Sequence, residues 1–202
     1  MTERFRGITI REGVLVKGPR GWGDFCPFPE YDDEVAAVWL ATALEAAWLG
    51  WPPPVRDHVP VNAIVPAVPP ERAHALVRRS GCRTAKVKVA EGTGSLAADA
   101  DRVAAVRDAL GPGGHVRVDA NGRWNVEDAV VALGVLDEVA QGLQYAEQPC
   151  ATVAELAEVR RRSHVPIAAD ESIRRAEDPV AVVRARAADV AVLKCTPLGG
   201  PL

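Results

Sequence analysis

Residues 84–120, TAKVKVAEGTGSLAADADRVAAVRDALGPGGHVRVDA, contain the pattern that decides the fold. The run at 84–90 is short, apolar and β-branched, as expected for a buried strand. The segment at 94–111 has the length and spacing of a helix, and a second apolar strand follows at 115–120. A strand–helix–strand unit of this kind predicts two neighbouring parallel strands.

The same unit recurs on both sides of this stretch. Further strands are expected at 61–68, 143–147, 166–170 and 189–194, and further helices at 69–81, 125–141, 152–163 and 178–188. Six short apolar strands alternating with five helical segments specify a parallel α/β fold. The regular units favour a (β/α) barrel over a doubly wound sheet. No glycine-rich phosphate loop follows the first strand, which also weighs against a doubly wound dinucleotide-binding domain.

The first sixty residues have a different pattern. GITIREGVLVKGPRGWGDF (7–25) predicts a hairpin with its turn at 18–21, and DDEVAAVWLATALEAAWLG (32–50) predicts a helix that Asp32 or Asp33 caps and Gly50 ends. The proline-rich WPPPVRDHVP (51–60) is a stiff connector. We therefore expect one domain over residues 1–60 and a second over 61–202.

Composition narrows the class of protein. The 202 residues carry a net charge of −3 without a basic patch, which argues against nucleic acid as a partner. No apolar run approaches ~18 residues and the N-terminus lacks a signal-peptide core, so we expect a cytoplasmic protein without a membrane partner. The four cysteines have no CxxC spacing and are expected to be reduced thiols.

An ionisable residue ends each of five successive strands: Lys88, Asp119, Glu147, Asp170 and Lys194. The intervals are 31, 28, 23 and 24 residues, each about one strand–helix unit. In a barrel the carboxyl ends of the strands converge on one mouth, where active sites of this architecture lie. The five side chains are therefore expected on one rim.

These side chains suit metal-assisted proton abstraction. Three neighbouring acids need a cation, and all-oxygen ligation suits Mg²⁺. A lysine could then remove the proton next to a substrate carboxylate, while the metal and an opposing lysine stabilise the enediolate. Lys86 lies on the same strand face as Lys88, where a neighbouring positive charge would lower the pKa of Lys88 toward the working range. Lysine is scarce, with four among 24 basic residues, so each lysine is a candidate for a role in proton transfer.

Each residue also has a structural explanation. A lone aspartate at a strand end often caps the following helix, and Lys86 and Lys88 could guard an exposed edge strand against aggregation. The three acids could pair with the many arginines. It is the coincidence of all five positions that favours a site.

At these residues the chain resembles the enolase superfamily, in its muconate-lactonizing-enzyme-like branch. KVKV (86–89) resembles the K-x-K strand, VDANGRW (118–124) the D-x-N strand, and YAEQP (145–149) the E-Q-P motif. IAADESI (167–173) resembles the D-E-S motif, and VLKCTPLGG (192–200) the segment of the opposing lysine. The resemblance extends in order from about residue 85 to residue 200.

The resemblance implies an α+β capping domain followed by a barrel of the modified (β/α)₇β type. It implies Mg²⁺ as cofactor, held by Asp119, Glu147 and Asp170. Lys88 would be the general base and then the acid that assists hydroxide departure. The resemblance assigns Lys86 to tuning Lys88, Lys194 to stabilising the enediolate from the opposite face, and Asn121 to substrate binding.

The segment GWGDFCPFPEYDDE (21–34) is similar to the capping loop of one group in this branch. For that group the implied reaction is dehydration of 2-succinyl-6-hydroxy-2,4-cyclohexadiene-1-carboxylate to 2-succinylbenzoate, a step of menaquinone biosynthesis. The same site could instead racemise N-acylamino acids or epimerise dipeptides. A barrel of this kind needs about 250 residues, so we expect one truncated after its sixth strand, and an inactive remnant that only binds metal or a partner is a third alternative.

Overall fold

The structure is a computed structural model that describes residues 8–91, 95–174 and 178–200. The chain divides into two compact units. The first comprises Met1–Val59 together with Leu193–Leu202, and the second comprises Pro60–Val192. The last ten residues thus group with the N-terminal unit. The predicted division into 1–60 and 61–202 stays a prediction.

The N-terminal unit is a hairpin packed on a helix. Strands β1 (Val14–Gly18) and β2 (Gly21–Phe25) pair antiparallel, and α1 spans Asp33–Trp48. Asp32 caps α1 by accepting a hydrogen bond from the Val35 N–H, as its position predicts. The hairpin lies so close to the helix that a Cβ on Gly23 would come within 1.9 Å of the Ala43 carbonyl oxygen. A short 3₁₀ helix, η1 (Thr196–Leu198), contacts α1.

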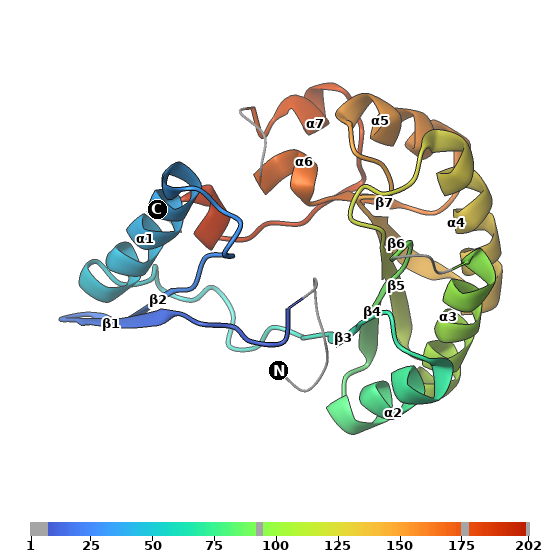
Figure 1. The fold of residues 1–202 in the computed structure, drawn as a ribbon, viewed down its shortest axis with the longest axis horizontal. Helices are drawn as coiled ribbons and strands as arrows, with labels where there is room; N and C mark the ends of the chain where they lie inside the picture. Colours follow the sequence, from blue (N-terminus) through green and yellow to red (C-terminus); the bar gives the residue numbers. More distant parts are fainter. Residues whose placement is uncertain (1–7, 92–94, 175–177, 201–202) are drawn as a thin grey trace. The chain divides into compact units, whose positions relative to one another are not determined.

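The second unit is a parallel sheet of six strands with helices along one face (Figure 1). The strands, in the order in which they pair, are β3 (Ala63–Val65), β4 (Thr84–Lys88), β5 (His115–Asp119), β6 (Leu143–Glu147), β7 (Ile167–Ala169) and β8 (Val190–Ala191). The helices are α2 (Pro70–Ser80), α3 (Leu96–Leu110), α4 (Val126–Ala140), α5 (Val153–Arg162), α6 (Glu171–Arg174) and α7 (Ala181–Arg184). The expected order of units is confirmed, and β3 and β8 form the two edges of the sheet.

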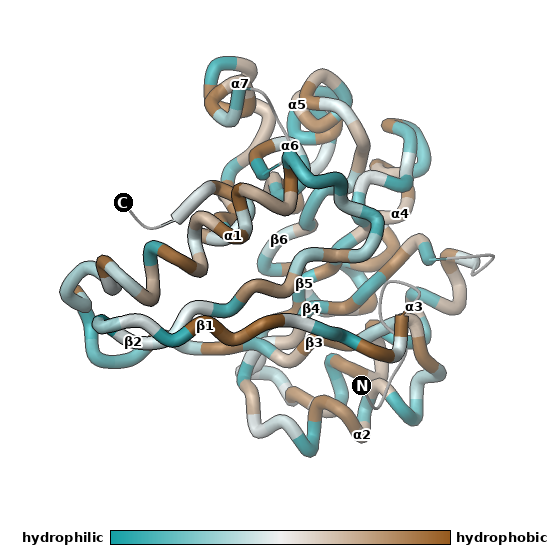
Figure 2. The backbone as a smooth tube through the Cα atoms, turned by 60° about the vertical axis from the view of Figure 1, so that its left-hand side comes forward, coloured by the Kyte–Doolittle hydropathy of each residue, from teal (hydrophilic) through white to brown (hydrophobic). Residues whose placement is uncertain are grey.

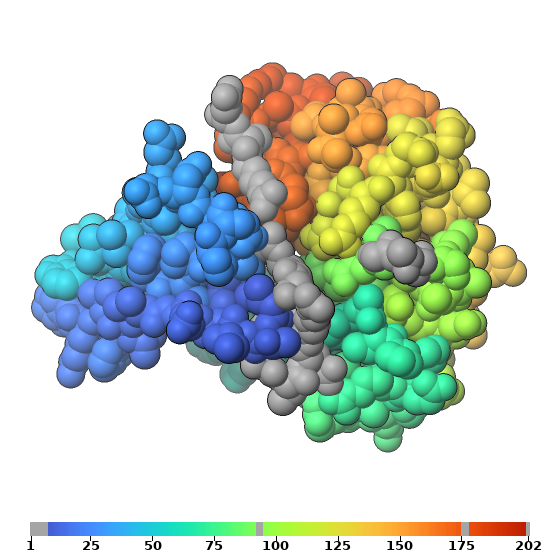
Figure 3. Space-filling model, in the orientation of Figure 1, coloured from blue at the N-terminus to red at the C-terminus, as the bar shows by residue number. Residues whose placement is uncertain are grey.

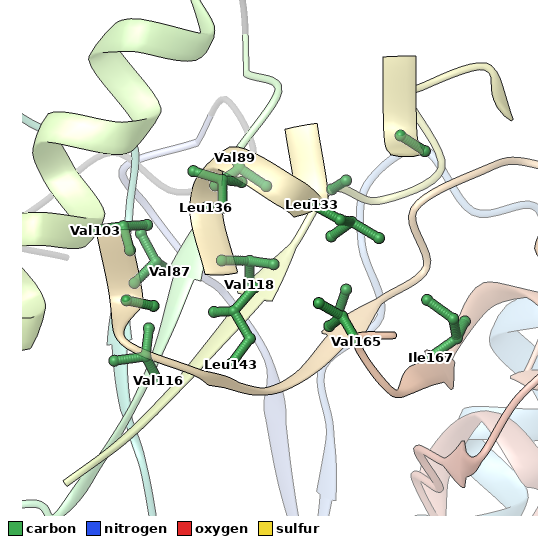
Figure 4. Close-up of a cluster of buried hydrophobic side chains, with 14 of the residues drawn as sticks. Val87, Val89, Val103, Val116, Val118, Leu133, Leu136, Leu143, Val165 and Ile167 are labelled. Carbon is green, nitrogen blue, oxygen red and sulfur yellow. The ribbon is translucent and has the colours of Figure 1, made fainter. Parts of the chain in front are cut away.

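The core lies between the sheet and its helices. Alternate residues of the strands, such as Val87 and Val118, meet Val103 of α3 and Leu133 and Leu136 of α4 (Figure 4). Helix α2 carries both hydrophobic and hydrophilic residues and buries Ala73 and Val77, four positions apart on one face, as expected of an amphipathic helix (Figure 2). Successive helices from α2 to α5 lie side by side on the surface of this unit (Figure 3). This packing fixes the height at which each strand ends.

The last strand–helix unit differs from the prediction. The helix expected at 178–188 is reduced to α7, because Arg186 adopts a left-handed φ of 50° and turns the chain. The additional short helix α6 begins directly after Asp170. Strand β8 pairs with β7 at only two positions, and β7 is itself only three residues long. Lys194 therefore lies beyond the end of β8 rather than on it.

No helix within the described ranges is long and apolar enough to cross a membrane. All four cysteines are free thiols, as expected. Burial raises the pKa of the Cys150 thiol to about 11, so this cysteine stays protonated at neutral pH.

Candidate active site

Four of the predicted site residues lie at the carboxyl ends of adjacent strands. Lys88, Asp119 and Glu147 are the last residues of β4, β5 and β6, and Asp170 directly follows β7. The strand register pairs Lys88 with Asp119, and Asp119 with Glu147. Lys88 is 4% exposed and the three acids are each 1% exposed. The spacing seen in the sequence thus becomes one buried row of charges.

Lys88 Nζ donates to two oxygens at the end of the neighbouring strand. One is Asp119 Oδ2 at 2.6 Å, and the other is Asn121 Oδ1 at 2.6 Å. Asn121 holds a left-handed φ of 49°, which aims its amide back toward Lys88. The Asn121 N–H also donates to Asp119 Oδ1. These contacts fix the direction in which the amine points.

Lys86 lies on the same face two residues earlier and contacts the next acid in the row. Its Nζ is 2.9 Å from both carboxylate oxygens of Glu147 and 3.3 Å from Asp119 Oδ2. Burial lowers the pKa of Lys86, but the carboxylates of Asp119 and Glu147 outweigh it and hold the pKa above its ordinary value. Lys86 and Lys88 therefore share one oxygen of Asp119, and the predicted tuning of Lys88 by Lys86 stays a prediction.

The two acids of this cluster respond in opposite ways. Burial favours protonation of Asp119, but Lys88 and Lys86 outweigh it and lower the pKa of this carboxyl. The pKa of Glu147 is raised by burial and by the charge of Asp119, with a further contribution from Asp170, although Lys86 opposes the change. Burial and the neighbouring carboxylates thus outweigh the stabilisation that Lys86 gives to the Glu147 carboxylate. An additional cation would stabilise it.

This imbalance predicts that Glu147→Gln stabilises the metal-free protein at neutral pH. A carboxyl whose folded pKa is raised binds its proton more tightly in the folded state, so stability falls as pH rises from 4.5, its ordinary value, through the raised pKa. Glutamine does not ionise, so Glu147→Gln avoids this loss of folding stability. The thermal midpoint without metal should rise at pH 7, by about 2–4 °C per kcal/mol for a chain of this size, and should change little at pH 4.

Glu127→Gln is the matched control. Glu127 is an exposed acid that contacts Arg162, and the hydrogen bond from Arg162 lowers its pKa. The effect of pH on stability is therefore reversed for Glu127, and Glu127→Gln should not raise the thermal midpoint at pH 7. A lower midpoint for Glu147→Gln at pH 7, relative to the unsubstituted protein, would contradict the account of Glu147.

Asp170 contacts a cation that sequence reasoning did not identify. Arg174, one turn later on α6, donates from Nε to Asp170 Oδ1 at 2.9 Å and from Nη2 to Glu171 Oε1 at 2.6 Å. Asn121 Nδ2 donates to the same Glu171 oxygen at 3.1 Å. Glu171 Oε2 is buried and has no hydrogen-bond partner among the described residues. The amide of Asn121 therefore joins Lys88 to Glu171.

Gln148 holds the third acid in register with the second. Its side-chain Oε1 accepts from the N–H groups of Asp170 and Ser172, at 3.0 and 3.2 Å. Its Nε2 donates to Ser172 Oγ and to the Cys150 carbonyl. Gln148 is fully buried, so these bonds lock the start of α6 against the end of β6.

A pocket of about 460 Å³ opens beside this row. Its lining consists of Asn121, Gly122, Gln148, Ala151, Thr152, Val153, Glu171 and Ser172. The pocket thus borders both Asn121, which contacts Lys88, and Glu171, which contacts Arg174. The Asn121 amide contacts Lys88 and Glu171, and its role in substrate binding stays a prediction.

The donor chemistry of the three acids fits a hard divalent cation. All would bind through carboxylate oxygen, and burial together with the charges of Asp119 and Asp170 raises the pKa of Glu147, which a cation would offset. In residues 8–91, 95–174 and 178–200, however, no three His, Cys, Asp or Glu side chains are arranged to hold a metal ion. Each acid instead contacts a cation of the chain: Lys88 and Lys86 at Asp119, Lys86 at Glu147, and Arg174 at Asp170.

Lys194 belongs to the N-terminal unit, whereas the residues of this cluster belong to the second unit. Its role as the opposing lysine stays a prediction. The residues that sequence reasoning missed are Arg174 and Glu171. Their signal lay in and directly after the D-E-S segment, where Glu171 and Arg174 follow Asp170 at one and four positions along the chain.

Two family profiles match the chain. The family described as "Enolase N-terminal domain-like" matches residues 1–47, and "Enolase C-terminal domain-like" matches residues 70–202. The chain is 65% identical, over 197 residues, to the o-succinylbenzoate synthase of Thermobifida fusca. That match covers 98% of this chain and 62% of the relative, so the chain spans about three fifths of the relative's length.

Solved structures show the same fold. The L-Ala-D/L-Glu epimerase of Bacillus subtilis superposes with a TM-score of 0.75 at 22% identity, covering 92% of this chain and 67% of the epimerase. A putative mandelate racemase/muconate lactonizing enzyme from Roseovarius nubinhibens, complexed with magnesium, gives 0.72 at 23% identity, covering 94% and 71%. At these identities the likeness concerns the fold alone.

Proposed function

The chain belongs to the enolase superfamily, and from that premise we propose that it carries the active site of a Mg²⁺-dependent carbon–oxygen lyase, o-succinylbenzoate synthase. The reaction would be dehydration of 2-succinyl-6-hydroxy-2,4-cyclohexadiene-1-carboxylate to 2-succinylbenzoate, in menaquinone biosynthesis. The 65% identity to the Thermobifida synthase over nearly the whole chain supports this choice of substrate.

One observation carries the proposal. A buried lysine, Lys88, lies at the end of β4 with its amine 2.6 Å from Asp119 at the end of β5. A second lysine and a second acid, Lys86 and Glu147, continue the row. Burying four ionisable groups side by side is unfavourable unless they neutralise one another. Such an arrangement at strand ends of a (β/α) fold is expected of a catalytic centre.

Asp119, Glu147 and Asp170 would hold the Mg²⁺, which supplies positive charge beside the substrate carboxylate. The magnesium in the Roseovarius structure is consistent with this cofactor. Lys88 Nζ would accept the α-proton once it is uncharged, and the same nitrogen would return the proton to the departing hydroxyl group, which leaves as water. Asn121 would keep the Lys88 amine directed at the reacting carbon through its Oδ1 contact. Lys194 would stabilise the negative charge that develops on the substrate carboxylate.

The test is to incubate the protein with the cyclohexadiene substrate and Mg²⁺ and follow aromatisation by absorbance, with the Thermobifida relative as positive control. We expect turnover that chelation of Mg²⁺ abolishes. Racemisation of an N-acylamino acid in a parallel assay, without aromatisation, would overturn the assigned substrate. Absence of any turnover in this chain, with an active control, would favour a chain that only binds metal or a partner.

A further inference from the structure

Helix α3 carries a buried ion pair outside the row of strand-end charges. Asp99 is 4% exposed and Arg102 is 7% exposed, and Arg102 Nη1 lies 2.7 Å from Asp99 Oδ1. The two residues are three positions apart, so they share one face of the helix. That face is turned toward the end of β4, where Lys88 lies.

The pair contacts the backbone on both sides of Val89. Arg102 Nη1 donates to the Lys88 carbonyl at 3.0 Å, and Asp99 Oδ2 accepts from the Ala90 N–H at 2.8 Å. Arg102 Nε donates to the Val68 carbonyl at 2.8 Å, which ties the segment after β3 to the same point. The carbonyl of Lys88, the proposed base, and the N–H of Ala90 are therefore both held by one ion pair.

The backbone at this point is strained. Ala90 adopts a φ of 59°, in the left-handed region that alanine rarely occupies. Such a conformation persists where the surroundings over-determine it, which happens most often at functional sites. The hydrogen bond to Asp99 supplies that constraint directly. It turns the chain away immediately after Lys88 and leaves the lysine at the end of the ladder, with Val89 N–H donating to the Asp119 carbonyl.

Stability alone does not account for a charged clamp here. A buried ion pair is weak evidence for stability, because apolar residues of similar volume often serve as well. The pair gives instead a set of directed contacts that hold the Lys88 and Val68 carbonyls and the Ala90 N–H together. We propose that Asp99 and Arg102 are positioning residues, which fix the Lys88 backbone so that its amine reaches the reacting carbon. This proposal rests on the function proposed above for Lys88.

The same helix offers a matched control. Arg107 is 8% exposed and donates to three backbone carbonyls, those of Gly111, Gly114 and Ala140, where Arg102 donates to two. These carbonyls lie in the segments that lead into β5 and β6, at the end of the strands opposite to Lys88. Arg107 is therefore a buried clamp without a contact to the base.

The experiment compares Asp99→Leu/Arg102→Met, which removes the acceptor of the Ala90 N–H together with both charges, with Arg107→Met in the aromatisation assay. Removing both charges together avoids leaving one ion buried without its partner. We expect kcat of the double variant to fall on the order of 10²-fold, the loss typical of a misplaced catalytic group, while KM changes by less than about threefold. The thermal midpoint should fall in both variants, but kcat of Arg107→Met should stay within about twofold of the parent.

Arg102→Lys tests the same point in a variant that retains the charge pair. A single ammonium cannot hold the Lys88 and Val68 carbonyls together as the guanidinium does, so kcat should fall while the midpoint stays near that of the parent. A parental kcat in both Arg102→Lys and the double variant would overturn the proposal. So would an equal loss of kcat in Arg107→Met.

A readout independent of turnover separates this proposal from the proposed function. Hydrogen exchange at the Ala90 amide should be slow in the parent protein and in Arg107→Met, and fast in the double variant. Slow Ala90 exchange in the double variant would overturn the clamp itself. Parental activity in Lys88→Ala would overturn the proposed function, with the Ala90 exchange still deciding whether the pair holds the strand end.

Discussion

Lys88→Ala is expected to lower kcat for aromatisation by about 10²- to 10⁴-fold, the contribution typical of a general acid–base group. The reason is that Lys88 Nζ is held by Asp119 and Asn121 at the buried end of β4, where alanine can accept no proton. Because the change occurs in the chemical step, KM should change much less. The measurement is a steady-state rate by absorbance at saturating Mg²⁺.

Lys17→Ala serves as its control. Lys17 lies on β1 in the N-terminal unit, with its amine 5.4 Å from the centre of the Trp22 ring. As one of only four lysines, it tests whether losing any lysine affects the rate. We expect no change in kcat. Equal rates for Lys88→Ala and Lys17→Ala would contradict the role of Lys88.

Asp170→Asn is expected to weaken Mg²⁺ binding by more than about 100-fold, since even groups that only orient a metal ligand contribute 10- to 100-fold. The amide replaces a buried carboxylate with a neutral oxygen, and Arg174 keeps its ion pair with Glu171 but loses the one with Asp170. Isothermal titration with Mg²⁺ measures the affinity directly, without any need for turnover. The metal requirement of the aromatisation rate should shift in parallel.

Asp189→Asn is the matched control for this change. Asp189 also pairs with an arginine, Arg160, and in addition accepts a hydrogen bond from the Ile167 N–H. It precedes β8 and contacts the beginning of β7, away from the row of strand ends. Its replacement should leave Mg²⁺ affinity unchanged. If Asp170→Asn bound Mg²⁺ as tightly as Asp189→Asn, the ligand assignment would fail.

The row at Lys88, Asp119, Glu147 and Asp170 could be predicted because strand length and unit length repeat. A parallel sheet places residues at the same phase of successive units at the same height, so spacing alone carries three-dimensional information. The partners within the row could not be predicted. Which acid each lysine contacts depends on side-chain direction, and Lys86 crosses to Glu147 while Lys88 contacts Asp119.

The burial of charged residues on helices could not be predicted from the sequence pattern. An acid and an arginine three positions apart on a helix give no sign of burial by their spacing, and it is the packing of α3 on β4 that encloses Asp99 and Arg102. The limits of β8 were equally hidden, because the apolar run at 189–194 continues past the two positions that pair with β7. Periodicity identifies a strand, but the number of pairing positions is set by its neighbour.

The central claim is that Lys88 acts as the base of a Mg²⁺-dependent site, and one comparison tests it most directly. Lys88→Arg keeps the positive charge, but a guanidinium cannot accept a proton at neutral pH. Aromatisation and Mg²⁺ affinity are measured side by side in Lys88→Arg and the parent protein. The account predicts Mg²⁺ affinity near that of the parent with turnover lost; turnover at the parental rate in Lys88→Arg would contradict it.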